Sequence, residues 1–223
     1  MTIFPTYQST TVTDFGADAT AHAANMPATV NPGDLLLAIA AFDMGAGTTI
    51  TTPSGWTLLG AQEGSTLIAS SFYGKVAVGD EDSATVDFVT SDAQRGSVHV
   101  FRVSGWAGAL DAIRLSSSSA GAASRDRLSI GTVARDILWI AAQIKSSATA
   151  WGATQPSGYS NVSKTNASED TTVSASIASA SRTNSAFEEL ITAWWNTTGL
   201  DLIIAVPPVG AAYTIRPRSL IGV

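Results

Sequence analysis

Few side chains of the chain could carry out nucleophilic chemistry. It contains two histidines, His22 and His99, and no cysteine. A Ser-His-acid triad would need one of these histidines, and no Gly-x-Ser-x-Gly elbow is present. His22 lies in an Ala-rich, turn-like segment and is interpreted as a solvated loop histidine. His99 shares a strand face with Phe101 and Val103 and is interpreted as partly buried and hydrogen-bonded. We therefore predict no catalytic residue and no histidine- or cysteine-based metal site.

Carboxylates offer two further chemistries, and their spacing favours neither. The segment 79–82, Gly-Asp-Glu-Asp, could supply oxygen ligands to calcium, but no EF-hand pattern surrounds it, so a charged hairpin turn is favoured. Glu188 and Glu189 are adjacent and would point to opposite faces of a strand, so they could not flank one glycosidic bond. No glycine-rich loop is spaced to hold phosphate. We expect no enzyme and no cofactor.

Aromatic residues are the remaining specific feature, with six tryptophans in the chain. Trp56 and Trp139 stand in predicted strands and are assigned to the core. Trp106 and Trp151 are flanked by small residues in predicted loops, where an indole could stack on a sugar or fill a pocket of a partner. The alternative for both rings is that they fold back over the end of the sandwich. Trp106 and Trp151 are thus the candidate partner- or glycan-contact residues.

Charge and hydropathy exclude two classes of partner. Twelve Lys and Arg against 18 Asp and Glu give a net charge of −6, and the isoelectric point is near 4.7. Such a chain repels phosphate backbones, so nucleic acid is not an expected partner. The longest apolar run, Leu35–Phe42, is far shorter than the roughly 20 residues of a spanning helix. We expect neither membrane insertion nor a signal peptide, because the N-terminal residues lack a basic and an apolar region.

Apolar residues recur mainly with period two in short segments bounded by Gly, Pro, Ser, Asn and Asp, which is typical of half-buried strands. Phe187–Trp195 fits a helix or a strand; we favour a strand, in which one of Trp194 and Trp195 would face outward. Many short strands at this spacing predict an all-β sandwich or barrel. The predicted strands are 10–15, 34–42, 56–63, 67–78, 84–90, 96–104, 111–115, 127–133, 136–145, 159–165, 171–182, 200–206 and 212–216.

Two segments of the chain echo each other. Residues 33–41, Gly-Asp-Leu-Leu-Leu-Ala-Ile-Ala-Ala, resemble 135–142, Arg-Asp-Ile-Leu-Trp-Ile-Ala-Ala, at an offset of 137 − 35 = 102. Pro-Ser-Gly-Trp at 53–56 matches Pro-Ser-Gly-Tyr at 156–159 at an offset of 156 − 53 = 103. One supersecondary unit used twice explains both matches, although common turn chemistry could also produce them. The prediction is a jelly-roll-like antiparallel β-sandwich with two similar halves; the alternative is two small tandem β-sandwich domains.

The boundary between the halves is predicted from composition. Residues 116–124 are a low-complexity Ser/Ala run, so 116–126 is predicted to be a linker or a long loop. It separates a first β half, 31–115, from a second, 127–223. Residues 1–30 are poorly patterned and are predicted to be an N-terminal arm or an edge segment. If they form an arm, its deletion should abolish docking without unfolding the sandwich.

The echoed residues also carry a family resemblance. The chain resembles virion proteins of tailed bacteriophages and prophages over about 30–210. The resemblance implies a β-sandwich that decorates a capsid, forms a head spike or belongs to the tail, usually in symmetric copies, and it transfers no functional residue. The residues that carry it are Asn-Pro-Gly-Asp-Leu-Leu-Leu at 31–37, Pro-Ser-Gly-Trp-Thr at 53–57, Phe-Tyr-Gly-Lys-Val-Ala at 72–77, Val-His-Val-Phe-Arg-Val-Ser-Gly at 98–105, Trp-Ile-Ala-Ala at 139–142 and Pro-Ser-Gly-Tyr at 156–159.

These observations lead to a functional expectation. We expect a non-enzymatic structural protein of a phage particle, assembled in the bacterial cytoplasm and located in the virion as a capsid decoration or head-spike protein. It would be oligomeric and bind other virion proteins of the capsid or tail. The alternative is a glycan-binding adhesin module of a tail or head fibre, in which Trp106 and Trp151 stack on host saccharides. An enzyme such as a depolymerase is disfavoured because a catalytic constellation is missing.

Overall fold

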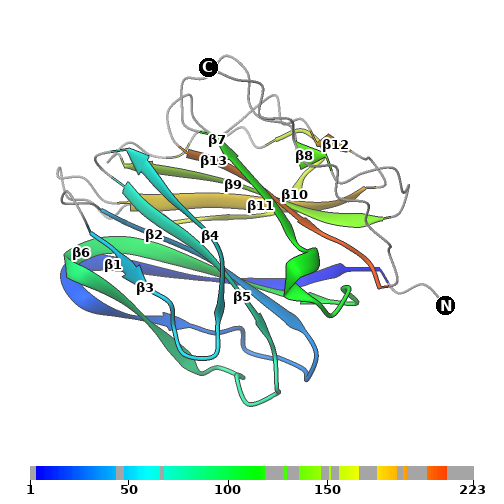
Figure 1. Ribbon diagram of the computed structural model, residues 1–223, viewed down its shortest axis with the longest axis horizontal. Helices are drawn as coiled ribbons and strands as arrows, with labels where there is room; N and C mark the ends of the chain where they lie inside the picture. The colour runs from blue at the N-terminus through cyan, green and yellow to red at the C-terminus, as the bar shows by residue number, and fades with distance from the viewer. Residues whose placement is uncertain are drawn as a thin grey trace.

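Two antiparallel sheets form the body of the protein in a computed structural model (Figure 1). The structure describes residues 4–43, 48–65, 68–118, 128–129, 136–146, 151, 156–165, 175–184, 188–189 and 200–209. The prediction of an all-β fold is confirmed for these residues. They contain no helix that could cross a membrane, and their helical structure is one short 3-10 turn, η1 (Leu110–Ala112).

Most strands overlap the predicted segments. The predicted strand 111–115 is displaced, because Leu110–Ala112 form η1 and β7 begins at Arg114, and β3 was not predicted. The predicted strands 84–90 and 96–104 are a single strand, β6, and 10–15 is the middle of a longer strand, β1. The prediction at 212–216 lies outside the described residues. The first sheet contains β1 (Thr6–Asn25), β2 (Leu35–Asp43), β3 (Ile50–Thr51), β4 (Thr57–Ser65), β5 (Ile68–Val76) and β6 (Thr85–Ser104). The second contains β7 (Arg114–Ser118), β9 (Ile137–Ser146), β10 (Ser160–Lys164), β11 (Ala175–Asn184) and β13 (Leu200–Val206), and β8 (Leu128–Ser129) pairs with β12 (Glu188–Glu189).

Both sheets have the same strand order. The first runs β4-β5-β2-β6-β1 and the second β10-β11-β9-β13-β7, so each sheet takes its strands from one continuous part of the chain. The change from one sheet to the other falls between β6 and β7, at residues 105–113. It is therefore earlier than the predicted linker 116–126, because Ser116, Ser117 and Ser118 pair with β13 as part of β7. The rest of that predicted linker lies outside the described residues.

Structurally equivalent positions in the two halves are 103 residues apart, which is one more than the offset of 102 in the first sequence match. Leu35 and Leu37 of β2 point into the space between the sheets, as do Leu138 and Ile140 of β9, which gives an offset of 103. At the offset of 102, Leu35 would match Ile137, which lies on the outer face of its sheet. A shift of one residue turns every side chain of a strand to the other face. The equivalent inward-facing residues of β2 and β9 therefore have the same offset, 103, as the two Pro-Ser-Gly turns.

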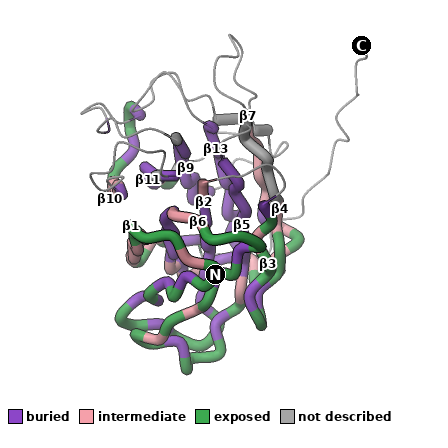
Figure 2. Tube along the Cα trace, turned by 90° about the vertical axis from the view of Figure 1, so that its left-hand side faces the viewer, coloured by how far each residue is buried: buried purple, intermediate pink, exposed green. Residues whose placement is uncertain are grey.

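The sheets share one core. Inward-facing residues of β2, β5 and β6 pack against those of β9, β11 and β13 in a single cluster, which includes Ile39, Phe101, Ile144 and Leu202. Figure 2 shows this burial continuing along β9, β11 and β13. The two halves thus form one sandwich, and the alternative of two tandem domains is wrong, because neither sheet has an inner core of its own.

A folded-back ribbon distinguishes the first half. β1 and β6 pair along their 20-residue lengths, with register shifts between Phe15 and Ala21, and beyond that bend they return over the outer face of the first sheet (Figure 1). Phe88 of the returning part packs 5.6 Å from Tyr73, measured between ring centroids. At the bend, a Cβ on Gly96 would lie 2.2 Å from the carbonyl oxygen of Ala41, so only glycine fits there.

Most of the segment 1–30 belongs to the ribbon, as the strand β1. Thr6–Asn25 form an edge strand, which is the second of the two predicted alternatives for this region. Ala24, Met26 and Val30 are buried in the core under the ribbon. Deleting residues 1–30 would therefore remove core side chains as well as a strand, and we expect it to unfold this part of the sandwich.

Candidate functional site

The structure places Trp106 inside the sandwich. It follows β6, forms an isolated bridge with Pro208, and is 4% exposed in the core between the sheets. Its indole N–H donates to the carbonyl oxygen of Gly33 at 2.9 Å. Trp106 therefore joins the loop before β2, through its indole, to the segment after β13, through its backbone. It presents no face that could stack on a ligand.

Trp151 is also an internal side chain. It is 9% exposed, packs on the outer face of the second sheet, and its indole N–H donates to the carbonyl oxygen of Thr165 at 2.8 Å. The Lys145 ammonium lies 4.3 Å from the ring centroid, and burial lowers the pKa of Lys145. Both proposed contact residues thus occupy the alternative position, packed against the sandwich.

The other tryptophan predictions have mixed outcomes. Trp56 and Trp139 are core residues, 8% and 0% exposed, as predicted. Trp194 and Trp195 lie outside the described residues. Within the ambiguous segment around them, the structure describes Glu188–Glu189, which is a strand.

His22 corrects one prediction. It is not a solvated loop residue: it lies in β1 and is 1% exposed. Its ring packs 4.3 Å from the ring centroid of Phe42, and its Nε2 is 3.3 Å from the hydroxyl of Thr90. Burial lowers its pKa. The strand alternation around His22 is carried mostly by alanines, which give no hydropathy contrast, so the sequence suggested a turn.

His99 fulfils its prediction as a buried, hydrogen-bonded strand residue. It is 0% exposed, and its Nδ1 lies 2.8 Å from the hydroxyl of Ser179 in the opposite sheet. Burial lowers the pKa of His99 to about 3. A histidine beside a serine has the composition of a nucleophile and its base, but Ser179 is also 0% exposed, so no substrate reaches the pair.

Two neighbouring hydroxyls extend this contact between the sheets. Ser97 donates to the carbonyl oxygen of Ala175 at 3.1 Å and accepts from the hydroxyl of Thr165 at 3.1 Å. Together with His99 and Ser179 they form a polar seam inside an otherwise apolar core. These hydrogen bonds link the two sheets and favour one alignment, although the Nε2 of His99 has no hydrogen-bond partner within the described residues.

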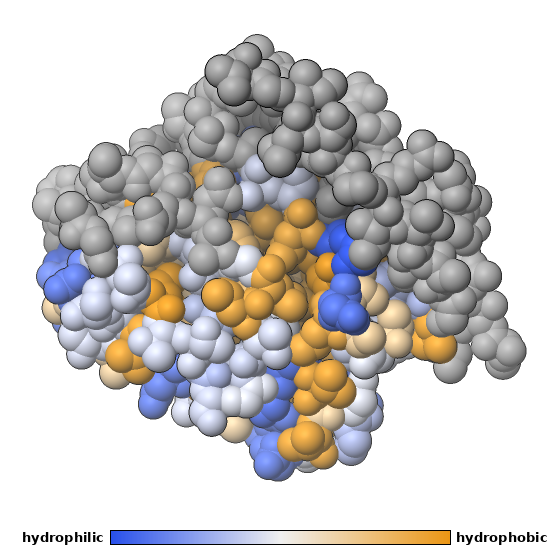
Figure 3. Space-filling model, viewed as in Figure 1, coloured by the Kyte–Doolittle hydropathy of each residue, from blue (hydrophilic) through white to orange (hydrophobic). Residues whose placement is uncertain are grey.

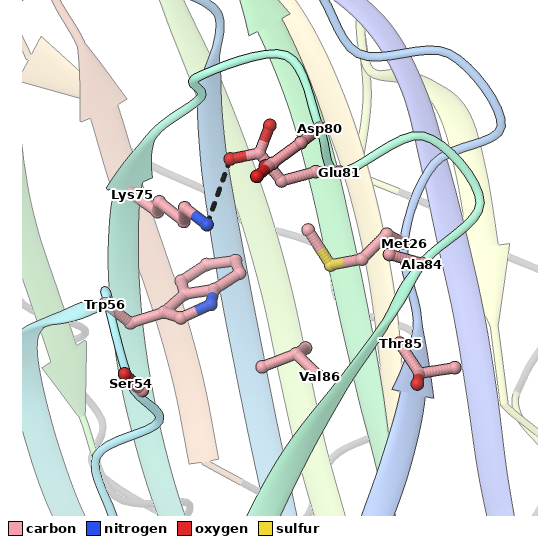
Figure 4. A pocket seen from close by; sticks show the side chains of 9 residues that line it. All are labelled: Met26, Ser54, Trp56, Lys75, Asp80, Glu81, Ala84, Thr85 and Val86. Carbon is pink, nitrogen blue, oxygen red and sulfur yellow. Dashed lines mark ion pairs between the residues drawn. The ribbon is translucent and has the colours of Figure 1, made fainter.

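A surface pocket of about 200 Å³ lies where the first Pro-Ser-Gly turn meets the end of β5 and the turn before β6 (Figure 4). The Trp56 indole stands in its centre, with Lys75 and Glu81 on one side and Val86 on the other. The full lining is Met26, Ser54, Trp56, Lys75, Asp80, Glu81, Ala84, Thr85 and Val86.

The acidic turn 79–82 organises one wall of this pocket. The Glu81 carboxylate accepts from the backbone N–H groups of Val78 and Gly79 and lies 2.9 Å from the Lys75 ammonium. Burial alone would raise the pKa of Glu81, but the lysine and the two N–H groups outweigh it and lower the pKa. Asp82 accepts from the N–H of Val30. These carboxylates hold a turn, and no cluster of three or more metal-ligating side chains occurs within the described part of the chain.

Sequence reasoning missed the pocket because its residues are far apart in the chain. Trp56 was assigned to the core, and the acidic segment 79–82 to a charged hairpin turn. The signal present in the sequence was the repeated Pro-Ser-Gly-aromatic motif. Comparison with known proteins adds no further identification: no family, no curated protein and no solved structure matches the chain.

Proposed function

We propose that this protein is a non-enzymatic structural component of a tailed-phage particle, either a capsid decoration protein or a head-spike component. The observation that supports it is the use of its polar and aromatic side chains as internal joints: Trp106 and Trp151 bind backbone carbonyls, and His99 binds the opposite sheet. A building block needs such rigidity more than a polarised site. The resemblance over residues 30–210 suggests the particle, and a virion location goes with it.

Exposed apolar side chains offer a surface for partners. Val76 and Val78, at and just after the end of β5, are 40% and 66% exposed, and Leu58 of the neighbouring β4 is 47% exposed. Figure 3 shows apolar atoms gathered on the face that carries β4 and β5 in Figure 1. We assign the apolar surface formed by Val76 and Val78 to contacts with other virion proteins or with a second copy of the chain.

The jelly-roll-like arrangement of the strands stays a prediction: the two sheets have the same strand order, and each takes its strands from one half of the chain. The adhesin alternative loses support for its two candidate rings, because Trp106 and Trp151 are buried.

Co-sedimentation with capsids tests the proposal. The purified protein, its mass determined by light scattering, is mixed with capsids that lack it, and stoichiometric sedimentation is expected. Val78→Asp should weaken capsid binding about tenfold or more, because it places a charge in the apolar surface. Val89→Asp is the matched control, since Val89 is 41% exposed on the folded-back ribbon. Failure of the unmodified protein to sediment would overturn the decoration proposal.

A further inference from the structure

We propose that the edge strand β1 is a dimerisation surface, at which two copies of the chain pair antiparallel along the segment 9–15 and join their first sheets. This inference goes beyond the proposed virion role and does not depend on it, because β1 is a different surface from Val76 and Val78. It rests on the contrast between the edges of the two sheets, on the direction of the backbone groups of β1 and on the side chains of the segment.

Three of the four edge strands of the two sheets carry features that oppose further pairing. β4 has two register shifts against β5. β10 has one register shift against β11, and Asn161 at this shift has a positive φ of 54°. β7 is five residues long and begins with Arg114. Irregular register, short length and charged residues are the features by which proteins protect sheet edges from other strands.

The segment 9–15 of β1 lacks these features. Its residues, Ser-Thr-Thr-Val-Thr-Asp-Phe, pair with 96–102 of β6 without a register shift, and each of them is half-buried or exposed. The segment contains no Lys, Arg or Pro, and Asp14 is its single charged residue. β1 stands at the end of the strand order, so among the described strands only β6 pairs with it. A regular, weakly charged edge is a template for another strand.

The register determines which backbone groups of the segment point outward. Just beyond the ends of β5 and β2, the Ala77 N–H donates to the carbonyl oxygen of Asp34 at 2.8 Å. Because bonded pairs alternate along an antiparallel ladder, the even-numbered residues of β2 bond to β5 and the odd-numbered ones to β6. In β6 the even-numbered residues therefore bond to β1, and they lie opposite the odd-numbered residues of the segment 9–15. The even-numbered residues of the segment direct their N–H and C=O groups away from the sheet: Thr10, Val12 and Asp14.

A second copy of the chain complements this edge. With a two-fold axis at Thr11, Thr10 of each copy lies opposite Val12 of the other, so their outward N–H and C=O groups form bonded pairs. Threonine faces threonine at the axis, which is a favourable cross-strand pair, and the two Asp14 side chains lie at opposite ends of the interface. A flexible peptide would lose conformational entropy on pairing, whereas β6 already holds β1 extended. The edge therefore fits a second copy better than a peptide.

Light scattering of the full chain between about 10 μM and about 1 mM tests the proposal. We expect a monomer–dimer equilibrium with a dissociation constant on the order of 100 μM at about 0.5 M NaCl. Each copy has a net charge of −6, so the copies repel each other at long range. Lowering the salt to about 0.05 M should therefore weaken the dimer several-fold. A chain that remains monomeric at about 1 mM in the higher salt overturns the proposal.

A charge at the axis tests the location of the interface. Thr11→Lys places two like charges opposite each other and should weaken the dimer about tenfold or more. Thr57→Lys is the matched control: it changes the net charge equally, and Thr57 is an exposed residue of the other edge strand of the first sheet, β4. The control should dimerise as the unmodified protein does. Equal dimerisation of the two variants would overturn the assignment to β1.

Cross-linking provides a second measurement that a smaller substitution allows. The chain has no cysteine, so Thr11→Cys introduces a single thiol. Directly opposite residues of a non-bonded antiparallel pair have Cα atoms about 4.5 Å apart, which is within the range of a disulfide. Under mild oxidation, Thr11→Cys should form a covalent dimer about tenfold faster than Thr57→Cys, because the two thiols meet at the axis. Equal rates for the two variants would overturn the proposed pairing.

Discussion

The two Pro-Ser-Gly turns of the molecule begin alike and end differently. In each turn the third residue, Gly55 or Gly158, has a positive φ of 76° or 79°, which glycine adopts without strain. The N–H of the aromatic residue that follows donates to the carbonyl of the turn's proline, at 3.1 Å for Trp56 and 3.2 Å for Tyr159. In both halves a cation from the neighbouring strand, Lys75 of β5 or Arg182 of β11, approaches the turn.

The cations then take different partners. The Lys75 ammonium turns to Glu81, whereas the Arg182 guanidinium lies over the Tyr159 ring. The acidic turn 79–82 and the folded-back ribbon belong to the first half, and together they leave the Trp56 pocket beside the turn. The local Pro-Ser-Gly motif thus positions the aromatic side chain, Trp56 or Tyr159, whereas long-range contacts decide whether a pocket forms beside it.

The largest expected effect concerns the ribbon that makes the halves unequal. Gly96→Ala would place a Cβ against backbone atoms of Ala41 and Phe42, so it should lower the free energy of unfolding by about 3 kcal/mol or more. Urea denaturation measures it. The control is Gly108→Ala, whose Cβ meets nothing within 4 Å and whose positive φ of 78° costs about 1 kcal/mol. Equal losses in the two variants would show that the ribbon is not tightly seated.

The second prediction concerns the seam that joins the halves. Because burial lowers the pKa of His99 from 6.5 to about 3, its contribution to stability is complete above pH 6.5 and is lost as the pH falls toward 3. Burial raises the pKa of Asp43 from 3.8 to about 7, even with Arg95 nearby, so that group has the opposite slope.

Comparing His99→Gln with the unmodified protein cancels the contribution of Asp43. The stability advantage of the unmodified protein should shrink by about 2 kcal/mol between about pH 7 and about pH 5. Chemical denaturation at each pH provides the measurement. An advantage that does not change with pH would mean that His99 titrates normally, and so that the seam is open to water.

The smallest expected changes in stability concern the two cations, Lys75 and Arg182, that approach the turns. Lys75→Met should cost about 2 kcal/mol, because it leaves the Glu81 carboxylate, 5% exposed, without its cation. Adding Glu81→Gln should recover part of that loss, which thermal or urea unfolding would reveal. In the second half, Arg182→Lys keeps a cation over Tyr159 and should cost less than about 1 kcal/mol. If Glu81→Gln restores none of the stability lost in Lys75→Met, Lys75 does not stabilise the first half through its ion pair with Glu81.

The positions of most strands and turns were predictable from the sequence. Short apolar segments bounded by turn residues located β2, β5 and β9 within about two residues, and the Pro-Ser-Gly motif marked equivalent turns in the two halves. These signals are local: an alternating strand must bury one face, and a positive φ favours glycine wherever it occurs. The burial of Trp139 followed from its place in β9, whereas Trp56 is buried although it stands just before β4.

Long-range packing decided the features that the sequence left open or misassigned. His22 is buried because the ribbon folds back over it, and Trp106 is buried because the segment after β13 returns beside it. The one-residue difference between the two echo offsets became visible only through the faces of β2 and β9. The pocket joins residues from Met26 to Val86. The sequence by itself determined the strands and turns through local backbone preferences, whereas burial, register and the pocket arose from contacts between residues far apart in the chain, to which those preferences are blind.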